Sequence, residues 1–387
     1  MSWAKVALGD LCHVSAGGTP SRGKASYFEG DIPWVKISDM LQGTIQTTDE
    51  SISEEGLANS SAKLFPKGTL LLSIFATVGR TAVLGIPAAT NQAIAGITPK
   101  GDRRVDLKYL RHYLDASVAN LLKQSRGVAQ VNINLSILKG FQIPLPPLLE
   151  QQRIAAILDK AEELRAKRRA AVALLDQLPQ SIFLEMFGDP KEVKTWKELR
   201  ISDFCHTGSG GTPSRQSESR YYMGGTIPWV KSGELRESVI YQTEERITSL
   251  ALAESSAKMV PAGAILLAMY GATVGRLAIL GISAATNQAV CNIVPDAELA
   301  DTTYLYHALQ NLVPSMISMA AGGAQPNISQ NIIRSLCVAL PPLDLQCEFA
   351  SRVSAISRTQ TAHQSALAQL DFLLTSLQHR AFNKGGA

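Results

Sequence analysis

The sequence lacks the features that mark secreted, disulfide-rich or membrane proteins. Its five cysteines are far apart and form no CxxC pair, so we expect neither a disulfide framework nor a zinc site. No apolar run approaches the roughly 18 residues needed to span a bilayer. The polar start, MSWAKVALGD, has no signal-peptide pattern. We therefore expect a cytoplasmic protein without a membrane partner.

Catalytic motifs are missing as well. The chain has no [ND]PP[YFW] or FxGxG methyltransferase motif and no cluster typical of a nuclease. The stretch GTPSRGKA, which begins at Gly18, comes close to a P-loop, but Ala25 stands where a magnesium-binding Ser or Thr is required. We therefore expect no catalysis, no metal site and no cofactor in this chain alone. A net charge of +4 permits a polyanionic partner without requiring one.

The main feature of the sequence is a repeat: one module of about 195 residues is written twice. Seven blocks recur in the same order, namely GGTPSR (17–22 and 210–215), IPWVK (32–36 and 227–231), SSAK (60–63 and 255–258), ATVGR (76–80 and 272–276), AATNQA (88–93 and 284–289), AQ-x-N (129–132 and 324–327) and LPPL (145–148 and 340–343). A solenoid repeat is only about 20 to 50 residues long, so each copy is a whole domain.

The predicted secondary structure changes along each copy from strands to helices. Short β-forming runs broken by Gly and Pro predict strands first, and apolar spacing predicts a helix at 107–122 and at 303–317. After each LPPL block, apolar steps of three and four predict a long amphipathic helix. Pro179 predicts a kink or a frayed end there. The expected seams are Ile154, Ile157, Ala161, Leu164, Arg168, Ala171, Leu175, Leu178 and Ile182, and Phe349, Val353, Ile356, Gln360, His363, Leu367, Leu370, Leu374 and Leu377.

A long helix with one apolar stripe needs a partner, and the other copy's helix, antiparallel, is the simplest one. The sequence thus predicts an α+β protein with internal pseudo-two-fold symmetry. Two similar mixed α/β domains, 1–145 and 191–340, are separated by two long antiparallel helices, 146–190 and 341–387, that form a coiled-coil spacer. B-DNA presents equivalent groove faces every 34 to 36 Å or so, so this plan suits two short DNA sequences separated by an unread gap. The same plan fits any extended ligand with a repeat.

The repeated blocks also resemble a known family. GGTPSR, IPWVK, the TVGR and TNQA segments and IPLPPLLEQQRIAAILDKAEEL at 143–164 resemble the specificity subunits of Type I restriction-modification systems. The most specific element is LPPLLEQQRIA. The second copy, LPPLDLQCEFA, departs from it at Cys347 and Glu348.

The resemblance implies a non-catalytic, sequence-specific DNA-binding subunit with two target recognition domains. Each domain would read one half of a bipartite target in double-stranded DNA. The helices would dock two methyltransferase subunits and so direct adenine methylation and restriction, and the restriction and translocase subunits would join through the complex. S-adenosylmethionine, ATP and magnesium would belong to those partners. A structural coiled-coil scaffold without sequence-specific DNA binding remains the alternative, and a divergent methyltransferase is a weaker one.

Glycine-rich turns, hydroxyls, cations and amides are the groups that approach phosphates and base edges. The candidate DNA-binding residues are Gly18, Thr19, Ser21, Arg22, Lys24, Lys36, Arg80, Gln130 and Asn132 in the first copy, and Gly211, Thr212, Ser214, Arg215, Lys231, Arg276, Gln325 and Asn327 in the second. The candidate partner-binding residues are Gln151, Gln152, Arg153 and Gln346. We expect Trp34 and Trp229 in the core.

Residues that are the same in both copies cannot distinguish two different half-sites. We therefore expect Asn91 and Gln92, with their counterparts Asn287 and Gln288, to make scaffold hydrogen bonds. Base specificity is expected in the segments that differ, 23–31 against 216–226 and 37–59 against 232–254.

Overall fold

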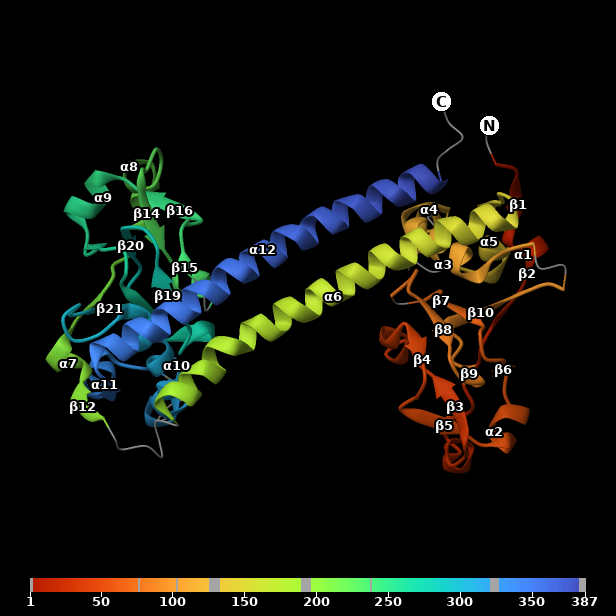
Figure 1. Ribbon diagram of the computed structural model, residues 1–387, viewed down its shortest axis with the longest axis horizontal. Helices are drawn as coiled ribbons and strands as arrows, with labels where there is room; N and C mark the ends of the chain where they lie inside the picture. The colour runs from red at the N-terminus through yellow and green to blue at the C-terminus, as the bar shows by residue number, and fades with distance from the viewer. Residues whose placement is uncertain are drawn as a thin grey trace. The chain divides into compact units, whose positions relative to one another are not determined.

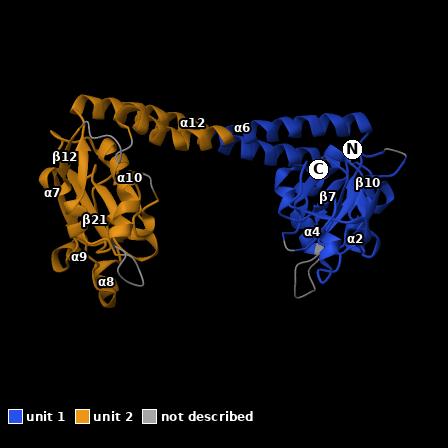
Figure 2. Cartoon of the chain, turned by 90° about the horizontal axis from the view of Figure 1, so that it is seen from below, with its two compact units in different colours: residues 1–169, 365–387 blue, residues 170–364 orange. Residues whose placement is uncertain are grey.

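The computed structural model describes residues 3–75, 77–101, 104–124, 133–188, 196–236, 239–320 and 327–382. The chain divides into two compact units, residues 1–169 with 365–387, and residues 170–364 (Figure 2). Within the described ranges, no helix is long and apolar enough to cross a membrane.

The first unit is built on two main sheets. Its strands are β1 (Lys5–Ala7), β2 (Cys12–Ala16), β3 (Ile32–Val35), β4 (Thr44–Ile45), β5 (Glu50–Ile52), β6 (Leu64–Phe65), β7 (Leu70–Ser73), β8 (Thr81–Leu84), β9 (Ala88–Thr90), β10 (Ile94–Pro99) and β11 (Gln142–Pro144). The sheets have the orders β2-β10-β7-β8-β4, β5-β3-β9-β6 and β1-β11 (Figure 1). The pairs β3–β9 and β4–β8 are parallel and the other pairs are antiparallel.

The side chains of β7 show how the layers pack. Leu70 and Leu72 lie in the core under the helices, whereas Leu71 lies in a second core with residues of β3 and β9. This alternation follows from the two-residue period of a strand. The five-stranded sheet is therefore the middle layer, between helices on one face and the four-stranded sheet on the other. The short helices of this unit are α1 (Leu8–Leu11), α2 (Glu54–Ala58), α3 (Leu107–Ala116), α4 (Val118–Gln124) and α5 (Leu135–Gly140).

The second unit repeats this topology strand for strand. Its strands are β12 (Lys197–Arg200), β13 (Cys205–Ser209), β14 (Ile227–Val230), β15 (Val239–Ile240), β16 (Glu245–Ile247), β17 (Met259–Val260), β18 (Ile265–Ala268), β19 (Leu277–Leu280), β20 (Ala284–Thr286), β21 (Val290–Pro295) and β22 (Cys337–Leu340). The sheet orders are β13-β21-β18-β19-β15, β16-β14-β20-β17 and β12-β22. Its short helices are α7 (Ile201–Phe204), α8 (Glu218–Tyr221), α9 (Ser249–Glu254), α10 (Thr302–Ala320) and α11 (Gln330–Ser335). The prediction of two similar mixed α/β domains is confirmed.

Two long helices, α6 (Leu148–Phe187) and α12 (Leu343–Phe382), belong to both units. In the first unit, Leu158 of α6 shares a core with Leu374 of α12. In the second, Phe183 of α6 packs edge-on against Phe349 of α12, with ring centroids 5.6 Å apart. The start of each helix thus meets the end of the other, which confirms the predicted antiparallel packing.

Three details of the helix predictions are wrong. Of the kink or frayed end predicted at Pro179, the frayed end is wrong, because α6 continues past the proline to Phe187. The helix expected at 107–122 is interrupted at Ser117, which separates α3 from α4.

The third error concerns the seam of α6. Ile157 and Leu164 are 40% and 41% exposed, and the buried apolar positions in the first half of α6 are Ile154, Ala155, Leu158 and Ala161. These four positions form a wider stripe than an a/d seam, because this part of α6 packs against the domain as well as against α12.

A buried glutamine joins each domain to the helix that follows it. The Gln151 side chain is fully buried, accepts a hydrogen bond from the Asp106 amide (2.8 Å) and donates to the carbonyls of Arg104 and Pro146. Gln346 repeats this arrangement with Asp301 (2.9 Å), Leu299 and Pro341. Both amides are enclosed and satisfied within their own unit. The expected partner contact of Gln151 and Gln346 gains no support from this arrangement and stays a prediction.

The two joints differ at one histidine. In the first unit the buried His112 of α3 lies 2.8 Å from Asp159 and 3.5 Å from Glu162, both on α6, beside Arg111. Burial lowers the pKa of His112, but hydrogen bonds to the two carboxylates outweigh it and raise the pKa above its usual value.

The equivalent His307 lies against apolar and aromatic groups. Its ring packs edge-on to Phe349, with centroids 5.2 Å apart. Here burial dominates and lowers the pKa of His307 to about 4. The same residue type therefore favours the charged form in one joint and the neutral form in the other.

The variants His112→Gln and His307→Gln should show opposite pH dependence. A raised folded-state pKa stabilises the wild type most below the unfolded pKa, so its advantage over His112→Gln should fall from about pH 5 to about pH 8. A lowered pKa acts in the other direction, so the advantage over His307→Gln should grow over that range. Thermal unfolding of the full chain at several pH values measures both slopes. Slopes of the same sign would contradict these assignments.

Candidate nucleic-acid interface

Four of the repeated blocks meet around the glycine-rich loop of each domain. In the first domain the Gly17 amide donates to the Ile94 carbonyl (3.0 Å) and the Gly18 amide to the Thr90 carbonyl (2.9 Å). A Cβ on Gly17 would lie 2.1 Å from the Thr90 oxygen, and one on Gly18 would lie 2.3 Å from the backbone of Ser61. The loop therefore requires glycine because it lies directly against the AATNQA and SSAK segments.

The second domain repeats this contact. Gly210 would place a Cβ 2.0 Å from the Thr286 oxygen, and Gly211 would place one 2.4 Å from the backbone of Ser256. The Gly211 amide donates to the Thr286 carbonyl at 2.8 Å.

The IPWVK block completes the arrangement. Trp34 is 2% exposed and its indole N–H donates to the Gly18 carbonyl at 3.0 Å, while Trp229, also 2% exposed, donates to Gly211 at 3.1 Å. The prediction that both tryptophans lie in the core is confirmed.

The amides of the AATNQA block also behave as scaffold. Thr19 donates to Gln92 and Thr212 donates to Gln288. Asn91 accepts a hydrogen bond from the Ala93 amide. These bonds favour the scaffold role expected of Asn91, Gln92 and Gln288, although the two glutamines are exposed. The buried Asn287 Oδ1 has no hydrogen-bond partner among the described residues, so the scaffold role of this residue stays a prediction.

Residues 77–80 and 272–276 of the ATVGR blocks lie in the turns that join β7 to β8 and β18 to β19. Gly79 and Gly275 adopt φ angles of +92° and +82°, a left-handed conformation that favours glycine. The strand before the first turn is joined to the AATNQA segment, because the Ile74 amide donates to the Ala93 carbonyl at 2.8 Å. Arg80, which is half-buried, and Arg276, which is exposed, follow these glycines.

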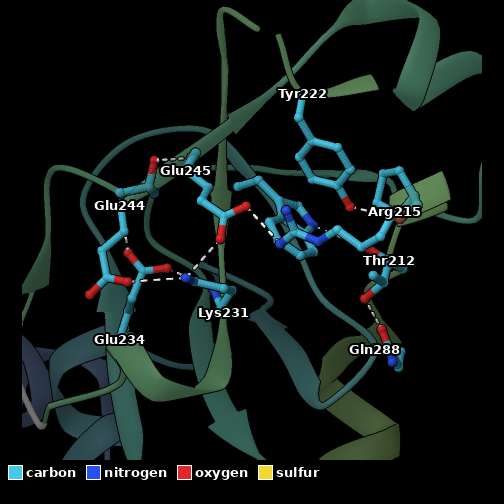
Figure 3. Close-up of polar contacts among 12 residues, drawn as sticks. Thr212, Arg215, Tyr222, Lys231, Glu234, Glu244, Glu245 and Gln288 are labelled. Atoms are coloured by element: carbon cyan, nitrogen blue, oxygen red, sulfur yellow. Dashed lines mark hydrogen bonds and ion pairs between the residues drawn. The ribbon is translucent and has the colours of Figure 1, made fainter. Parts of the chain in front are cut away.

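The arginine of each glycine-rich loop is stacked and ion-paired. The Arg22 guanidinium lies 4.1 Å from the centroid of the Phe28 ring and 2.8 Å from a carboxylate oxygen of Glu50. In the second domain Arg215 lies 4.1 Å from the Tyr222 ring and 2.7 Å from Glu245 (Figure 3).

The lysine of each IPWVK block shares the same carboxylate. Lys36 Nζ lies 2.9 Å from Glu50, and Lys231 Nζ lies 2.9 Å from Glu245 (Figure 3). Because each lysine is already paired with a carboxylate of its own domain, its ammonium group is less available to bind a phosphate than the sequence suggested.

Sequence reasoning missed Glu50 and Glu245. It also missed two further carboxylates that brace the lysine segments: Asp39 accepts from the Lys36 amide at 2.7 Å, and Glu234 accepts from the Lys231 amide at 2.9 Å. A signal was present, since TDESI at 48–52 corresponds to TEERI at 243–247 with the same offset as the IPWVK blocks.

The remaining candidates lie in several places. Ser21, Lys24, Ser214 and Asn327 are exposed, and Lys24 donates to the Tyr27 hydroxyl at 3.0 Å. Gln152 and Arg153 are exposed near the start of α6. The candidates Gln130, Asn132 and Gln325 fall outside the described residues.

The segments expected to carry base specificity flank these clusters. Residues 21–26 are exposed, and the segment passes through a short 3-10 helix, Ala25–Phe28. In the second domain the corresponding segment is longer and contains α8, whose Arg220 pairs with Glu254 at 3.1 Å. Across the described part of the chain, no group of three or more His, Cys, Asp or Glu side chains is placed to hold a metal ion.

The substitution Gly210→Ala should displace the glycine-rich loop, whereas Gly208→Ala should not. The first Cβ would meet backbone atoms of Thr286, and the second would meet nothing within 4 Å. We expect Gly210→Ala to lower the free energy of unfolding by about 1–3 kcal/mol through overpacking. Gly208→Ala, the matched control, should change it by less than about 0.5 kcal/mol. Urea denaturation followed by tryptophan fluorescence compares the two, and equal effects would disprove the close approach.

Comparison with known proteins covers nearly the whole chain. The model of the family described as Type I restriction modification DNA specificity domain matches residues 1–173 and 193–371. The specificity subunit of the Type I restriction enzyme MjaIX from Methanocaldococcus jannaschii is 26% identical over 380 residues, which cover 92% of this chain and 86% of that protein. The EcoR124I/EcoR124II specificity subunit from Escherichia coli is 30% identical over 202 residues, covering 50% of this chain and 47% of that one.

Solved structures agree on the fold. The crystal structure of a Type-I restriction-modification system S subunit from M. genitalium matches with a TM-score of 0.61 at 14% identity, over 98% of this chain and 96% of that one. A chain from a structural study of complex assembly and conformational transition of the type I R-M system matches with a TM-score of 0.64 at 19% identity, over 98% and 97%. The family match, which spans both copies of the repeat, shows that this chain belongs to the specificity subunits of Type I restriction-modification systems.

Proposed function

We propose that this chain reads a bipartite target in double-stranded DNA, with one half-site for each of its two domains. The observation that carries the proposal is that the same loop cluster is built twice, around Gly17 and around Gly210, and that each cluster is flanked by exposed segments that differ between the copies. The shared residues would form the scaffold and the backbone grip, and the differing segments would contact the bases. As a specificity subunit, the chain is itself non-catalytic.

The long helices support a second part of the proposal. Exposed side chains at the start of α6, among them Gln152 and Arg153, would dock one methyltransferase subunit, and the corresponding surface of α12, with Cys347 and Glu348, would dock another. Restriction and translocase subunits would join through that complex. S-adenosylmethionine, ATP and magnesium would then be bound by the partners, and the complex would methylate adenine and direct restriction.

The complex of this chain with its methyltransferase subunit should protect two DNA patches about one helical turn apart. Arg22→Ala should weaken the contact in one patch, and Arg215→Ala should weaken the contact in the other. Each variant that loses a phosphate contact should make the slope of log K against log salt concentration shallower by about one. Lys139→Ala, which removes an exposed cation from the helix α5, is the matched control. Footprinting and binding at several salt concentrations measure these effects. A complex without any sequence preference would favour the scaffold alternative.

Exchanging residues 1–145 with residues 194–340 should invert the order of the two half-sites, because each domain carries its own reading segments. Long-read detection of methylated adenines in a host that expresses the wild-type or exchanged chain with its methyltransferase gives both targets directly. The unread gap should stay the same length, which serves as the internal control. An unchanged target in the exchanged chain would show that the domains do not read independently.

A further inference from the structure

The cations closest to the glycine-rich loops are bound by carboxylates of their own domain. Glu50 lies 2.8 Å from Arg22 and 2.9 Å from Lys36, and Glu245 lies 2.7 Å from Arg215 and 2.9 Å from Lys231. The same one-carboxylate, two-cation contact therefore occurs in both domains. Figure 3 shows it in the second domain.

Further acidic side chains surround these cations, so the clusters differ from a simple basic patch that binds phosphates. Asp49 lies 3.8 Å from Lys36, and Glu244 lies 3.1 Å from Lys231. Asp39 binds the Lys36 backbone amide. In the first domain two cations thus face three carboxylates, so this cluster has no local excess of positive charge to attract a phosphate. A phosphate can gain these cations only by competing with a glutamate.

The arginine side chain is fixed on two sides and open on the rest. An aromatic ring covers one face of the guanidinium at 4.1 Å in both domains, and the glutamate binds one edge. The side chains of Arg22 and Arg215 are nevertheless 56% and 49% exposed. A guanidinium has five N–H donors in a rigid fork, so one held in this way retains donors for a ligand that approaches from a defined direction.

We propose that Glu50 and Glu245 are positioning residues that set the discrimination between target and non-target DNA. Each glutamate keeps an arginine and a lysine from binding the phosphates of non-target DNA. It also holds the arginine in one orientation, in which the arginine can contact DNA that is bound at the target sequence. The inference rests on the proposed function, because it assumes that these domains bind DNA.

Both glutamates stay ionised at neutral pH. The hydrogen bond from Lys36 lowers the pKa of Glu50 below its usual value. Partial burial acts to raise the pKa of Glu245, but hydrogen bonds from Lys231 and Arg215 outweigh it and lower the pKa overall. The discrimination should therefore not change with pH across the neutral range.

The test uses the complex of the full chain with its methyltransferase subunit. The probes are a duplex that carries the target found by methylation mapping and a duplex of the same composition with that target scrambled. The double variant Glu50→Gln, Glu245→Gln should bind the scrambled duplex about tenfold more tightly at about 0.1 M salt for each freed cation that gains a phosphate. For that duplex, the slope of log K against log salt concentration should steepen by about 0.9 for each such contact. Affinity for the target should rise less, so the ratio of the two affinities falls.

Two controls separate the role of these carboxylates from general effects of charge and folding. The double variant Asp10→Asn, Glu298→Gln removes the same number of charges, one from an exposed position in each domain, and it should leave the ratio and the slope unchanged. The double variant Lys36→Gln, Lys231→Gln tests the same idea without removing the glutamates. If the lysines are withheld from random phosphates, the affinity for the scrambled duplex should stay within about twofold, whereas free lysines would lose about tenfold for each contact.

The outcomes distinguish the inference from the function on which it rests. A wild-type complex that does not prefer the target would overturn the proposed function, and the inference with it. A wild-type complex that prefers the target, with Gln variants that keep its ratio and salt slope, would overturn the inference alone. If the Gln variants melt below the assay temperature, the lysine variants decide, and a tenfold loss on the scrambled duplex would count against withholding.

Discussion

Backbone lies against backbone where the glycine-rich loop of each domain meets the AATNQA and SSAK segments, and this contact leaves no room for a side chain. A Cβ at Gly17 or Gly210 would overlap a threonine carbonyl oxygen. The other shared features follow from this approach: the tryptophan below the loop donates to its second glycine, and the loop ends at the arginine that stacks on Phe28 or Tyr222. Four of the repeated sequence blocks, GGTPSR, IPWVK, SSAK and AATNQA, thus touch each other in both domains.

The repeat, the long helices and the buried tryptophans could be predicted because each leaves a local signal. Identical blocks can be aligned by eye, helices show spacing of three and four, and a tryptophan between a proline and a valine in a short apolar run favours the core. The glutamates of the clusters could not be placed in this way. Glu50 reaches Lys36 because β3 pairs with β5 and sets Trp34 opposite Glu50. That register is a long-range property.

The sequence could not tell buried from exposed polar residues on the long helices for a related reason. Gln151 is buried and its neighbour Gln152 is exposed, but the two are the same residue type in the sequence. What distinguishes them is that backbone carbonyls of the domain accept hydrogen bonds from Gln151. The apolar seam shifted because the first half of α6 packs against a domain as well as against a second helix, which a heptad pattern does not represent. His112 and His307 occupy equivalent positions, yet their pKa values move in opposite directions because only the first has carboxylates opposite it.

The division of the long helices between the units has a consequence for synthesis on the ribosome. The core of the first unit includes Leu374 of α12, and Phe382 packs edge-on against Tyr109, with ring centroids 5.6 Å apart. The second unit is continuous in the chain, from residue 170 to residue 364, and so it is nested within the first. The domain that is translated first is therefore completed last. Until α12 emerges, the nascent chain exposes an apolar surface on α3 and α6, and folding of the nested unit replaces a long open loop with a compact insert, which lowers the entropy lost on closure.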